Sequence, residues 1–352
     1  MEPADDPEIP VLPVVRQPQG LKYYLGTWSG RILLVNAIIF LWMVAREPSS
    51  LWVPNIEFVR QFGSKSLSDI ALGQYWRFVT PMFVHIGIIH FIFNAMALYY
   101  IGYQIEYILG GRWFLILYLV SGFIGNLSSC IFSISPSAGA SGALFGLLGA
   151  GFRLERLVSD TFDRQGERLR PRKRIYSAMV ITNIVLGLVI PVIDNAAHIG
   201  GLVAGWFLME ALLRSRPNRL RARKPVIAFM IYSVMALFAG FAVLRSIDPD
   251  TVLARYYKSA RAADSAPEAY QDFTEALRIH PLDPKSRLYR GELLLQSRQL
   301  EKGIEDIKLG LMTGKLSDAD VEGVITNLQM TGHSLEAEIV RKLKAEAAST
   351  DI

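Results

Sequence analysis

The chain has 352 residues, of which 51% are hydrophobic and 20% charged. A soluble globular domain is ordinarily less apolar and more charged, so this composition argues against a wholly soluble protein. The formal net charge of +5 comes with short basic runs between apolar stretches, which indicates membrane topology signals rather than a nucleic-acid surface.

Seven apolar stretches are candidates for membrane spans, and they predict an all-α, polytopic membrane helix bundle with the lipid bilayer as its surroundings. The fourth and fifth are short for a full crossing, so we expect neighbouring helices or a water-filled cavity to shelter them. The stretches lie at about 31–47, 82–106, 113–132, 140–153, 175–190, 196–213 and 225–244.

The distribution of basic residues predicts the orientation of these spans. Eight Lys and Arg residues lie in 153–174 and six in 210–224, whereas 133–139 and 191–195 contain none. Because Lys and Arg mark cytoplasmic loops, we expect the N-terminus to lie in the cytoplasm. Residues 1–30 are expected to form a disordered leader and not a cleavable signal peptide. Seven spans then put the C-terminal domain on the exoplasmic side, a layout that suits a bacterial plasma membrane.

Two segments near the outer surface carry polar side chains, which are costly at membrane depth and usually face a cavity or a partner. The first outer loop, about 48–81, is apolar but too broken to span, and its Trp76-Arg77 pair is typical of an interfacial anchor. The second span opens with His85, His90 and Asn94. The last two are four residues apart, so they share one helix face.

A serine and a histidine are predicted to lie at one depth. Ser141 begins the fourth span and His198 lies near the start of the sixth, and both spans run inward from the outer face. Both carry small residues at a spacing that lets helix backbones approach closely. Packing alone would explain each piece, but polar groups from three spans at one depth favour chemistry. The small residues are Gly139, Gly142, Gly146, Gly149, Ala197, Gly201 and Gly205.

Such a pair is suited to acyl transfer, because a serine hydroxyl becomes a nucleophile when a neighbouring imidazole takes its proton. Asp194 lies near the membrane surface and is interpreted as a helix start, so no acid is placed to orient His198 and a dyad is expected. Phe145, one turn after Ser141, offers a ring on which the imidazole can stack. The histidine–asparagine pair of the second span and the backbone N–H of Ser141 are candidate donors to an oxyanion.

Residues 251–347 are predicted to form a separate soluble helical domain outside the membrane. They show a 34-residue period of small, large and small residues, which resembles tetratricopeptide hairpins, although a generic helical domain fits nearly as well. A groove of the tetratricopeptide kind would suit a peptide or protein partner. The recurring residues are Ala269, Phe273 and Ala276, then Gly303, Ile307 and Gly310, with a weaker third unit around Ala337.

In their order along the chain, the membrane motifs resemble the rhomboid family of intramembrane serine proteases. Each motif is weak alone, but the full set is specific and covers about residues 76–205. The resemblance implies a six-helix catalytic core, here at 31–215, and some members append a further span and an extramembrane domain. The motifs are Trp76-Arg77, His85-x4-His90-x3-Asn94, Gly139-Ala140-Ser141-Gly142 and Ala197-His198-x2-Gly201-x3-Gly205.

The resemblance also implies roles for these residues. Ser141 would be the nucleophile and His198 its general base, while His90 and Asn94 would help to form the oxyanion hole. The Trp76-Arg77 loop would stabilise the fold. Where some members carry tyrosine one turn after the serine, Phe145 keeps the stacking but donates no hydrogen bond. The implied substrates are transmembrane proteins, with no metal or other cofactor.

Three alternatives are weighed against this reading. A catalytically silent relative that binds transmembrane clients usually lacks the serine or the histidine, and both are present here. A zinc enzyme would use His85, His90 and His198, but the chain has no H-E-x-x-H motif. A transporter would place its polar residues near the midplane, commonly within an inverted repeat, and no such repeat is apparent.

The predicted orientation is tested by a topology reporter fused after Ile352. With a cytoplasmic N-terminus and seven spans, we expect an alkaline phosphatase fusion to be active and a green fluorescent protein fusion to be dark. The reverse pattern would remove one span from the prediction.

Overall fold

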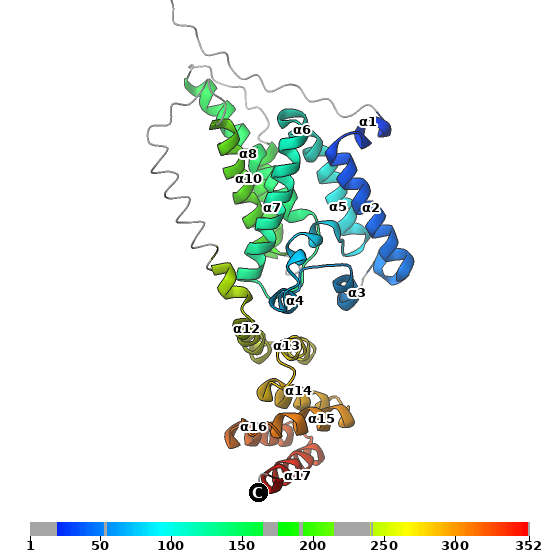
Figure 1. Cartoon of the computed structure of the whole chain (residues 1–352), viewed down its shortest axis with the longest axis vertical. Helices are drawn as coiled ribbons and strands as arrows, with labels where there is room; N and C mark the ends of the chain where they lie inside the picture. The colour runs from blue at the N-terminus through cyan, green and yellow to red at the C-terminus, as the bar shows by residue number, and fades with distance from the viewer. Residues whose placement is uncertain are drawn as a thin grey trace, which may run out of the picture. The chain divides into compact units, whose positions relative to one another are not determined.

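The computed structural model describes residues 20–52, 55–164, 175–189, 193–214, 240 and 242–350, and their regular secondary structure is helical (Figure 1). The chain divides into two compact units. The first consists of residues 1–66 and 75–243, and the second of residues 67–74 and 244–352. Most of the predicted leader, part of the basic loop 153–174 and nearly all of the predicted seventh span lie outside the described residues.

Four helical segments of the described chain are long and apolar enough to cross a membrane. The other helices of this unit lie before or between these four segments, and α9 is apolar but short. The four are α2 (Trp28–Arg46), the stretch Gly87–Leu109, α7 (Gly111–Phe132) and α10 (Asn195–Arg214). The stretch Gly87–Leu109 comprises α5 (Gly87–Ala97), the π-helical η4 (Leu98–Gly102) and α6 (Tyr103–Leu109). The others are α1 (Leu21–Leu25), η1 (Pro48–Leu51), α3 (Ile56–Gln61), η2 (Tyr75–Phe78), η3 (Thr80–Phe83), α8 (Ser141–Arg164) and α9 (Ile175–Val189).

Two helix boundaries differ from those that the sequence predicts. The second span begins at Gly87 rather than near 82, because Gly87 has a φ of +78° that breaks the chain direction after η3. The fourth helix continues from the predicted end near 153 to Arg164, because charged residues such as Arg153 and Glu155 end a membrane span without ending a helix. His85 therefore precedes the helix that carries His90.

Glu106, near the end of the second span, caps the start of α2. Its two carboxylate oxygens accept hydrogen bonds from the backbone N–H groups of Trp28 and Ser29, each at 2.8 Å. The first N–H groups of a helix have no partner within the helix, and a carboxylate there also interacts favourably with the helix dipole. The contact joins the second span to the first.

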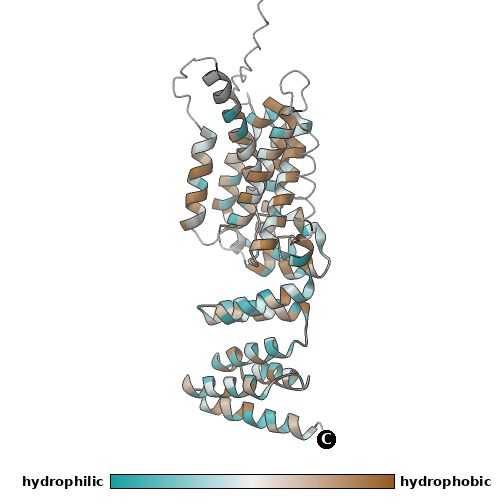
Figure 2. Cartoon of the chain, turned by 90° about the vertical axis from the view of Figure 1, so that its left-hand side faces the viewer, coloured by the Kyte–Doolittle hydropathy of each residue, from teal (hydrophilic) through white to brown (hydrophobic). Residues whose placement is uncertain are grey.

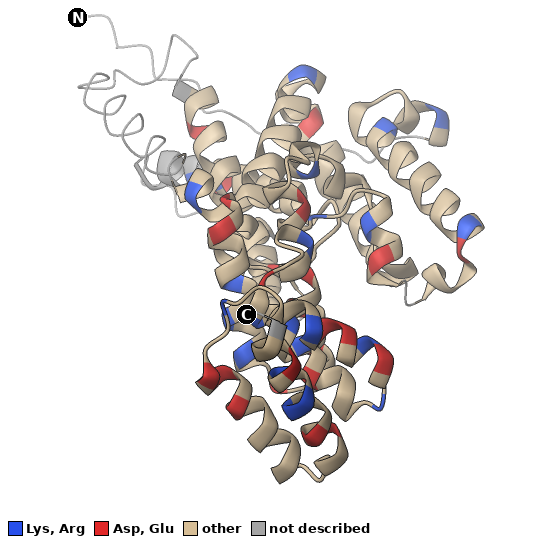
Figure 3. Ribbon diagram, turned by 60° about the horizontal axis from the view of Figure 1, so that its bottom comes forward, with Lys and Arg blue, Asp and Glu red and all other residues tan. Residues whose placement is uncertain are grey.

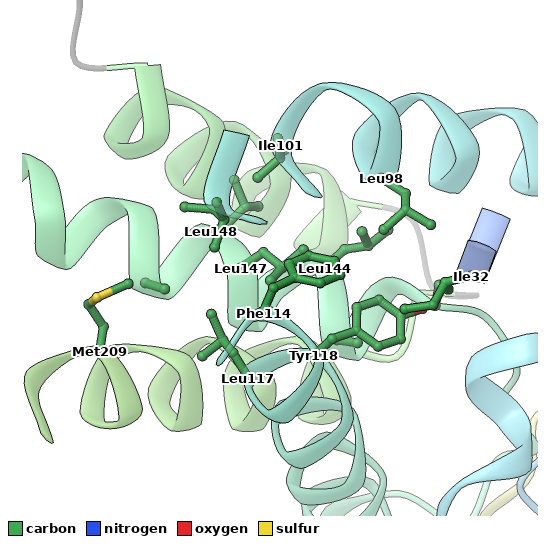
Figure 4. Packing of buried hydrophobic residues seen from close by; sticks show 14 of the residues in the cluster. Ile32, Leu98, Ile101, Phe114, Leu117, Tyr118, Leu144, Leu147, Leu148 and Met209 are labelled. Carbon is green, nitrogen blue, oxygen red and sulfur yellow. The ribbon is translucent and has the colours of Figure 1, made fainter. Parts of the chain in front are cut away.

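The core of the first unit lies where α7 and α8 meet the second span (Figure 4). Phe114, Leu117 and Tyr118 of α7 are fully or almost fully buried against Leu144 and Leu147 of α8. These large side chains pack against α8. Protein therefore surrounds the segment 140–153, which is short for a membrane crossing. Figure 2 shows the helices of this unit predominantly brown, as expected for elements that face lipid and each other.

Glycines bring α8 and α10 into backbone contact. A Cβ added to Gly205 would overlap the carbonyl of Gly146, and one added to Gly201 would overlap the carbonyl of Gly142. At Gly149 a Cβ would overlap the carbonyl of Leu202. Small residues permit such an approach because no side chain separates the two backbones, which gains dispersion energy where lipid supplies no hydrophobic driving force.

The second unit consists of helix pairs and one short helix from the loop before Tyr75. The hairpins contain the residues of the 34-residue period: Ala276 and Ile307 are fully buried, and the third pair buries Ala337. Within this unit, Ser68 of α4 donates to Glu275 of α13. The helices are α4 (Leu67–Ala71), α12 (Pro249–Ala262), α13 (Ala266–Ile279), α14 (Pro284–Gln296), α15 (Leu300–Leu311), α16 (Asp318–Met330) and α17 (Ser334–Thr350).

Charged side chains of both signs are interspersed on these hairpins, as expected for a solvent-exposed domain (Figure 3). Within the hairpin of α14 and α15, the buried Asp306 of α15 accepts hydrogen bonds from Arg287 and Arg290 of α14. Nearby, burial raises the pKa of Glu292, which accepts a hydrogen bond from Asn327 of α16. The Asp306 contacts hold the two helices of one hairpin together, and the Glu292–Asn327 contact joins that hairpin to the next. That the hairpins are tetratricopeptide repeats stays a prediction.

The glycine contacts predict that Gly205→Ala destabilises the first unit by about 1–3 kcal/mol, the usual cost of overpacking. The measurement is the thermal unfolding midpoint in detergent. Gly142→Ala is the matched control, because its Cβ would lie 3.6 Å from the nearest atom, the carbonyl oxygen of Ala197. Equal midpoints for the two variants would contradict the backbone contact.

Candidate active site

Ser141 and His198 are hydrogen-bonded to each other across the contact between α8 and α10. Ser141 Oγ lies 2.8 Å from His198 Nε2. Ser141 is the first residue of α8, and the chain enters this helix through Gly139, whose φ of +129° lies in a region that side chains disfavour. The backbone of this entry is fixed, because the N–H of Gly139 donates to the carbonyl of Pro81 at 2.8 Å. The serine is thus presented by a sharp turn at a helix start.

The imidazole of His198 is held by stacking. Its ring lies on the ring of Phe145 with centroids 4.0 Å apart and planes inclined by 10°. His198 Nδ1 is buried and has no hydrogen-bond partner among the described residues. For Nε2 to accept the serine proton, Nδ1 must carry the hydrogen in the neutral ring. The geometry therefore has the two members of a dyad, with an aromatic ring stacked on the face of the imidazole and no acid bonded to Nδ1 among the described residues.

Asp194 caps the helix that carries His198 and makes no hydrogen bond with the imidazole. It is the residue before α10, and its Oδ1 accepts a hydrogen bond of 3.0 Å from the N–H of Ala197. Its Oδ2 accepts one of 2.5 Å from Ser129 Oγ. Burial pushes its pKa upward, but the charge of Lys65 and these hydrogen bonds outweigh burial and leave the pKa below its usual value. The expected helix start is thus an N-cap.

The second-span residues lie beside the turn that leads to Ser141. The ring of His90 is so close to Gly139 that a Cβ there would lie 2.6 Å from His90 Cε1. His85 is buried next to it, with ring centroids 5.5 Å apart. Asn94 Nδ2 donates to the carbonyl of His90 at 2.8 Å, one turn back in its own helix. The structure thus brings His90 to the turn, whereas the amide of Asn94 is engaged by its own backbone.

The Trp76-Arg77 pair divides into an exposed ring and a buried cation. Trp76 is 57% exposed and Arg77 only 7%. Arg77 Nη1 donates to the carbonyls of Arg60 and Ser64 at 2.9 and 2.7 Å. A buried guanidinium that binds loop carbonyls fixes the loop, whereas an exposed indole is suited to the membrane interface. Arg77 is therefore a structural member of the outer loop.

No sequence motif marks Lys65, yet the structure places it against the end of α7 and the segment that leads to Ser141. Lys65 is fully buried in the outer loop, and its Nζ donates to Ser129 Oγ at 2.7 Å. A lysine in a polar loop segment ordinarily indicates solvent exposure, so the sequence pattern offers no signal of this position.

The described residues include no group of three or more His, Cys, Asp or Glu side chains that could hold a metal ion. His198 contacts Ser141 and Phe145, while the rings of His85 and His90 have centroids 5.5 Å apart. The described site offers a hydroxyl and an imidazole in contact, the two groups that nucleophilic catalysis by serine uses.

Sequence comparison relates the chain to known proteins. Residues 72–215 match the family model described as "Rhomboid domain". The chain is 41% identical to the rhomboid protease GluP of Bacillus subtilis over 158 residues, which cover 45% of this chain and 30% of that protein. It is 42% identical to RHOMBOID-like protein 7 of Arabidopsis thaliana over 148 residues, 41% of this chain and 45% of that protein. The chain thus spans less than half the length of these two relatives.

A relative from another lineage is matched over more of its length. Rhomboid-like protease 3 of Toxoplasma gondii is 29% identical over 238 residues, which cover 65% of this chain and 84% of that protein.

The stacking predicts that Phe145→Ala slows the reaction of Ser141 with a fluorophosphonate probe by roughly tenfold, because a stacked ring contributes about 0.5–1.5 kcal/mol. Phe145→Tyr keeps the ring face and is expected to react at the rate of the unaltered protein. The second-order labelling rate in detergent is the measurement. Equal rates for all three proteins would show that the ring does not hold the imidazole.

Proposed function

Because residues 72–215 of this integral membrane protein belong to the rhomboid family, we propose that the chain is an intramembrane serine protease with a Ser141–His198 dyad. The observation that carries the proposal is the 2.8 Å separation of Ser141 Oγ and His198 Nε2. This distance is within the range in which a base takes a proton from a nucleophile. Packing between two glycine-rich helices does not by itself require a half-buried hydroxyl bonded to an imidazole.

In the proposed reaction Ser141 Oγ attacks the carbonyl carbon of a peptide bond while His198 Nε2 takes the hydroxyl proton. The tetrahedral intermediate collapses, the C–N bond breaks, and His198 returns the proton to the leaving amine. Water then attacks the acyl-serine ester, again losing its proton to His198, and the serine is regenerated. Each step needs only the hydroxyl, the imidazole and one water, so neither a metal nor another cofactor enters.

Stabilisation of the oxyanion is expected from the start of α8. The first N–H groups of a helix lack partners within the helix, so those of Ser141 and Gly142 are available at the place where negative charge develops. His90, which adjoins Gly139, is the nearest side-chain candidate. Asn94 Nδ2 gives one of its two N–H groups to the carbonyl of His90, and the other N–H is proposed as a further donor to the oxyanion.

The proposed substrates are transmembrane segments of other membrane proteins. Their peptide bonds are engaged in helical hydrogen bonds, so a segment must unwind locally before a carbonyl can reach Ser141. Small or helix-breaking residues near the outer end of the substrate helix would ease this step. The helical hairpins of the second unit are proposed to bind a peptide or protein partner.

The test is cleavage of a single-pass substrate by the purified protein in liposomes. Ser141→Ala and His198→Ala are each expected to lower the cleavage rate by at least about a thousandfold, because the two residues act as one unit. The cleaved bond is expected near the outer end of the substrate helix and is located by mass spectrometry.

Two outcomes would redirect the proposal. Cleavage at the unaltered rate by both variants would exclude the dyad. Binding of the segment by both the unaltered protein and Ser141→Ala, with no cleavage by either, would identify a catalytically silent relative instead.

A further inference from the structure

Lys65 is the only fully buried lysine among the described residues, and both its backbone and its side chain are engaged near the dyad. A buried ammonium is costly unless it is paired and hydrogen-bonded, so a lysine retained in such a place has close partners. The partners of Lys65 come from the segments that precede Ser141 and His198 in the chain.

The backbone of Lys65 pairs with the turn that leads to the serine. Its N–H donates to the carbonyl of Ser137 at 2.7 Å, and the N–H of Ser137 donates back to its carbonyl at 3.3 Å. Ser137 is four residues before Ser141, and Gly139 between them is held by the carbonyl of Pro81. The approach to the nucleophile is thus fixed by two pieces of the outer loop.

The side chain of Lys65 reaches the start of the histidine helix through one hydroxyl. Its Nζ donates to Ser129 Oγ at 2.7 Å and to the carbonyl of Ser133, at the end of α7, at 3.2 Å. Ser129 Oγ in turn donates to Asp194 Oδ2 at 2.5 Å. A hydroxyl that accepts from an ammonium and donates to a carboxylate has its direction set by the two charges.

Asp194 transmits this contact to His198 through the first turn of α10. Its Oδ1 caps the N–H of Ala197 at 3.0 Å, and its own carbonyl accepts from the N–H of His198 at 3.1 Å. The position of the cap therefore sets the position of the backbone that carries the imidazole. No carboxylate among the described residues accepts a hydrogen bond from His198 Nδ1. The orientation of the ring therefore depends on the position of the His198 backbone and on stacking against Phe145.

We propose that Lys65 is a positioning residue for the Ser141–His198 dyad, with its backbone fixing the turn before the serine and its ammonium, through Ser129, fixing the Asp194 cap of the histidine helix. The inference rests on the proposed protease function and assigns no contact of Lys65 with the substrate. In this arrangement the charges of Lys65 and Asp194 hold the start of α10. In a triad, by contrast, the acid is hydrogen-bonded to the imidazole itself.

The experiment measures the fluorophosphonate labelling rate of Ser141, kcat and KM for a single-pass substrate, and the thermal midpoint in detergent. Lys65→Met keeps the backbone pairing and removes the ammonium. We expect its labelling rate and kcat to fall by about ten- to a hundredfold with KM unchanged, since a small misplacement of reacting groups has effects of this size. If Lys65→Met does not fold, Ser129→Ala takes its place. Ser129→Ala keeps both charges and removes the hydroxyl between them, and it is expected to lower the labelling rate and kcat as well.

Rescue distinguishes positioning from general destabilisation. Asp194→Asn preserves a good N-cap and removes the second charge, so the double variant Lys65→Met/Asp194→Asn buries no unpaired charge. It is expected to recover most of the labelling rate lost in Lys65→Met. The matched control is Arg153→Met. This variant breaks the ion pair of Arg153 with Glu210, which joins α8 to α10 farther from the dyad. That variant is expected to lower the thermal midpoint and to leave the labelling rate unchanged.

Failure of this inference differs visibly from failure of the proposed function. If the unaltered protein neither labels nor cleaves, the protease proposal fails and the positioning role fails with it. If the unaltered protein labels and Lys65→Met labels equally fast, or if Lys65→Met and Arg153→Met lose rate and stability in the same proportion, only the positioning role is overturned. Additive losses in the double variant would also overturn it.

Discussion

The approach of α8 to α10 is the constraint on which the site depends. Gly146 faces Gly205 and Gly142 faces Gly201 with backbone against backbone, so the distance between the helix axes is set by main-chain atoms. Ser141 and His198 lie near the N-terminal ends of these helices, and at this spacing Ser141 Oγ and His198 Nε2 are 2.8 Å apart. A wider spacing would separate the hydroxyl from the imidazole, whatever their identity.

Polar groups are costly within an apolar bundle, and several of the described polar groups have hydrogen-bond partners close to them in space. Glu106 caps α2, Asp194 caps α10, and Lys65 shares Ser129 with Asp194. These contacts lie at helix starts, where unpaired N–H groups favour acids. The capping hydrogen bonds hold the start of α10, and the ring of His198 stacks on Phe145 and is hydrogen-bonded to Ser141.

Much of this arrangement can be read from residue types and spacing. The apolar stretches predict the helices, because backbone groups in lipid must be satisfied within a segment. The glycines predict the close pair, and serine and histidine early in two inward-running spans predict their common depth. The 34-residue period marks positions such as Ala276 and Ile307 that are buried in the hairpins. Residue roles in the site and the tetratricopeptide assignment remain predictions.

The sequence by itself determined the membrane bundle and the pairing of Ser141 with His198, because apolar length and small-residue spacing are local properties of the chain. Tertiary structure alone decided that Arg77 is buried while Trp76 is exposed, that Asn94 donates to its own helix, and that Lys65 links two helix starts. Such outcomes depend on which distant segment supplies a partner. The partners of Lys65 lie 64 or more residues away, a separation that no local pattern records.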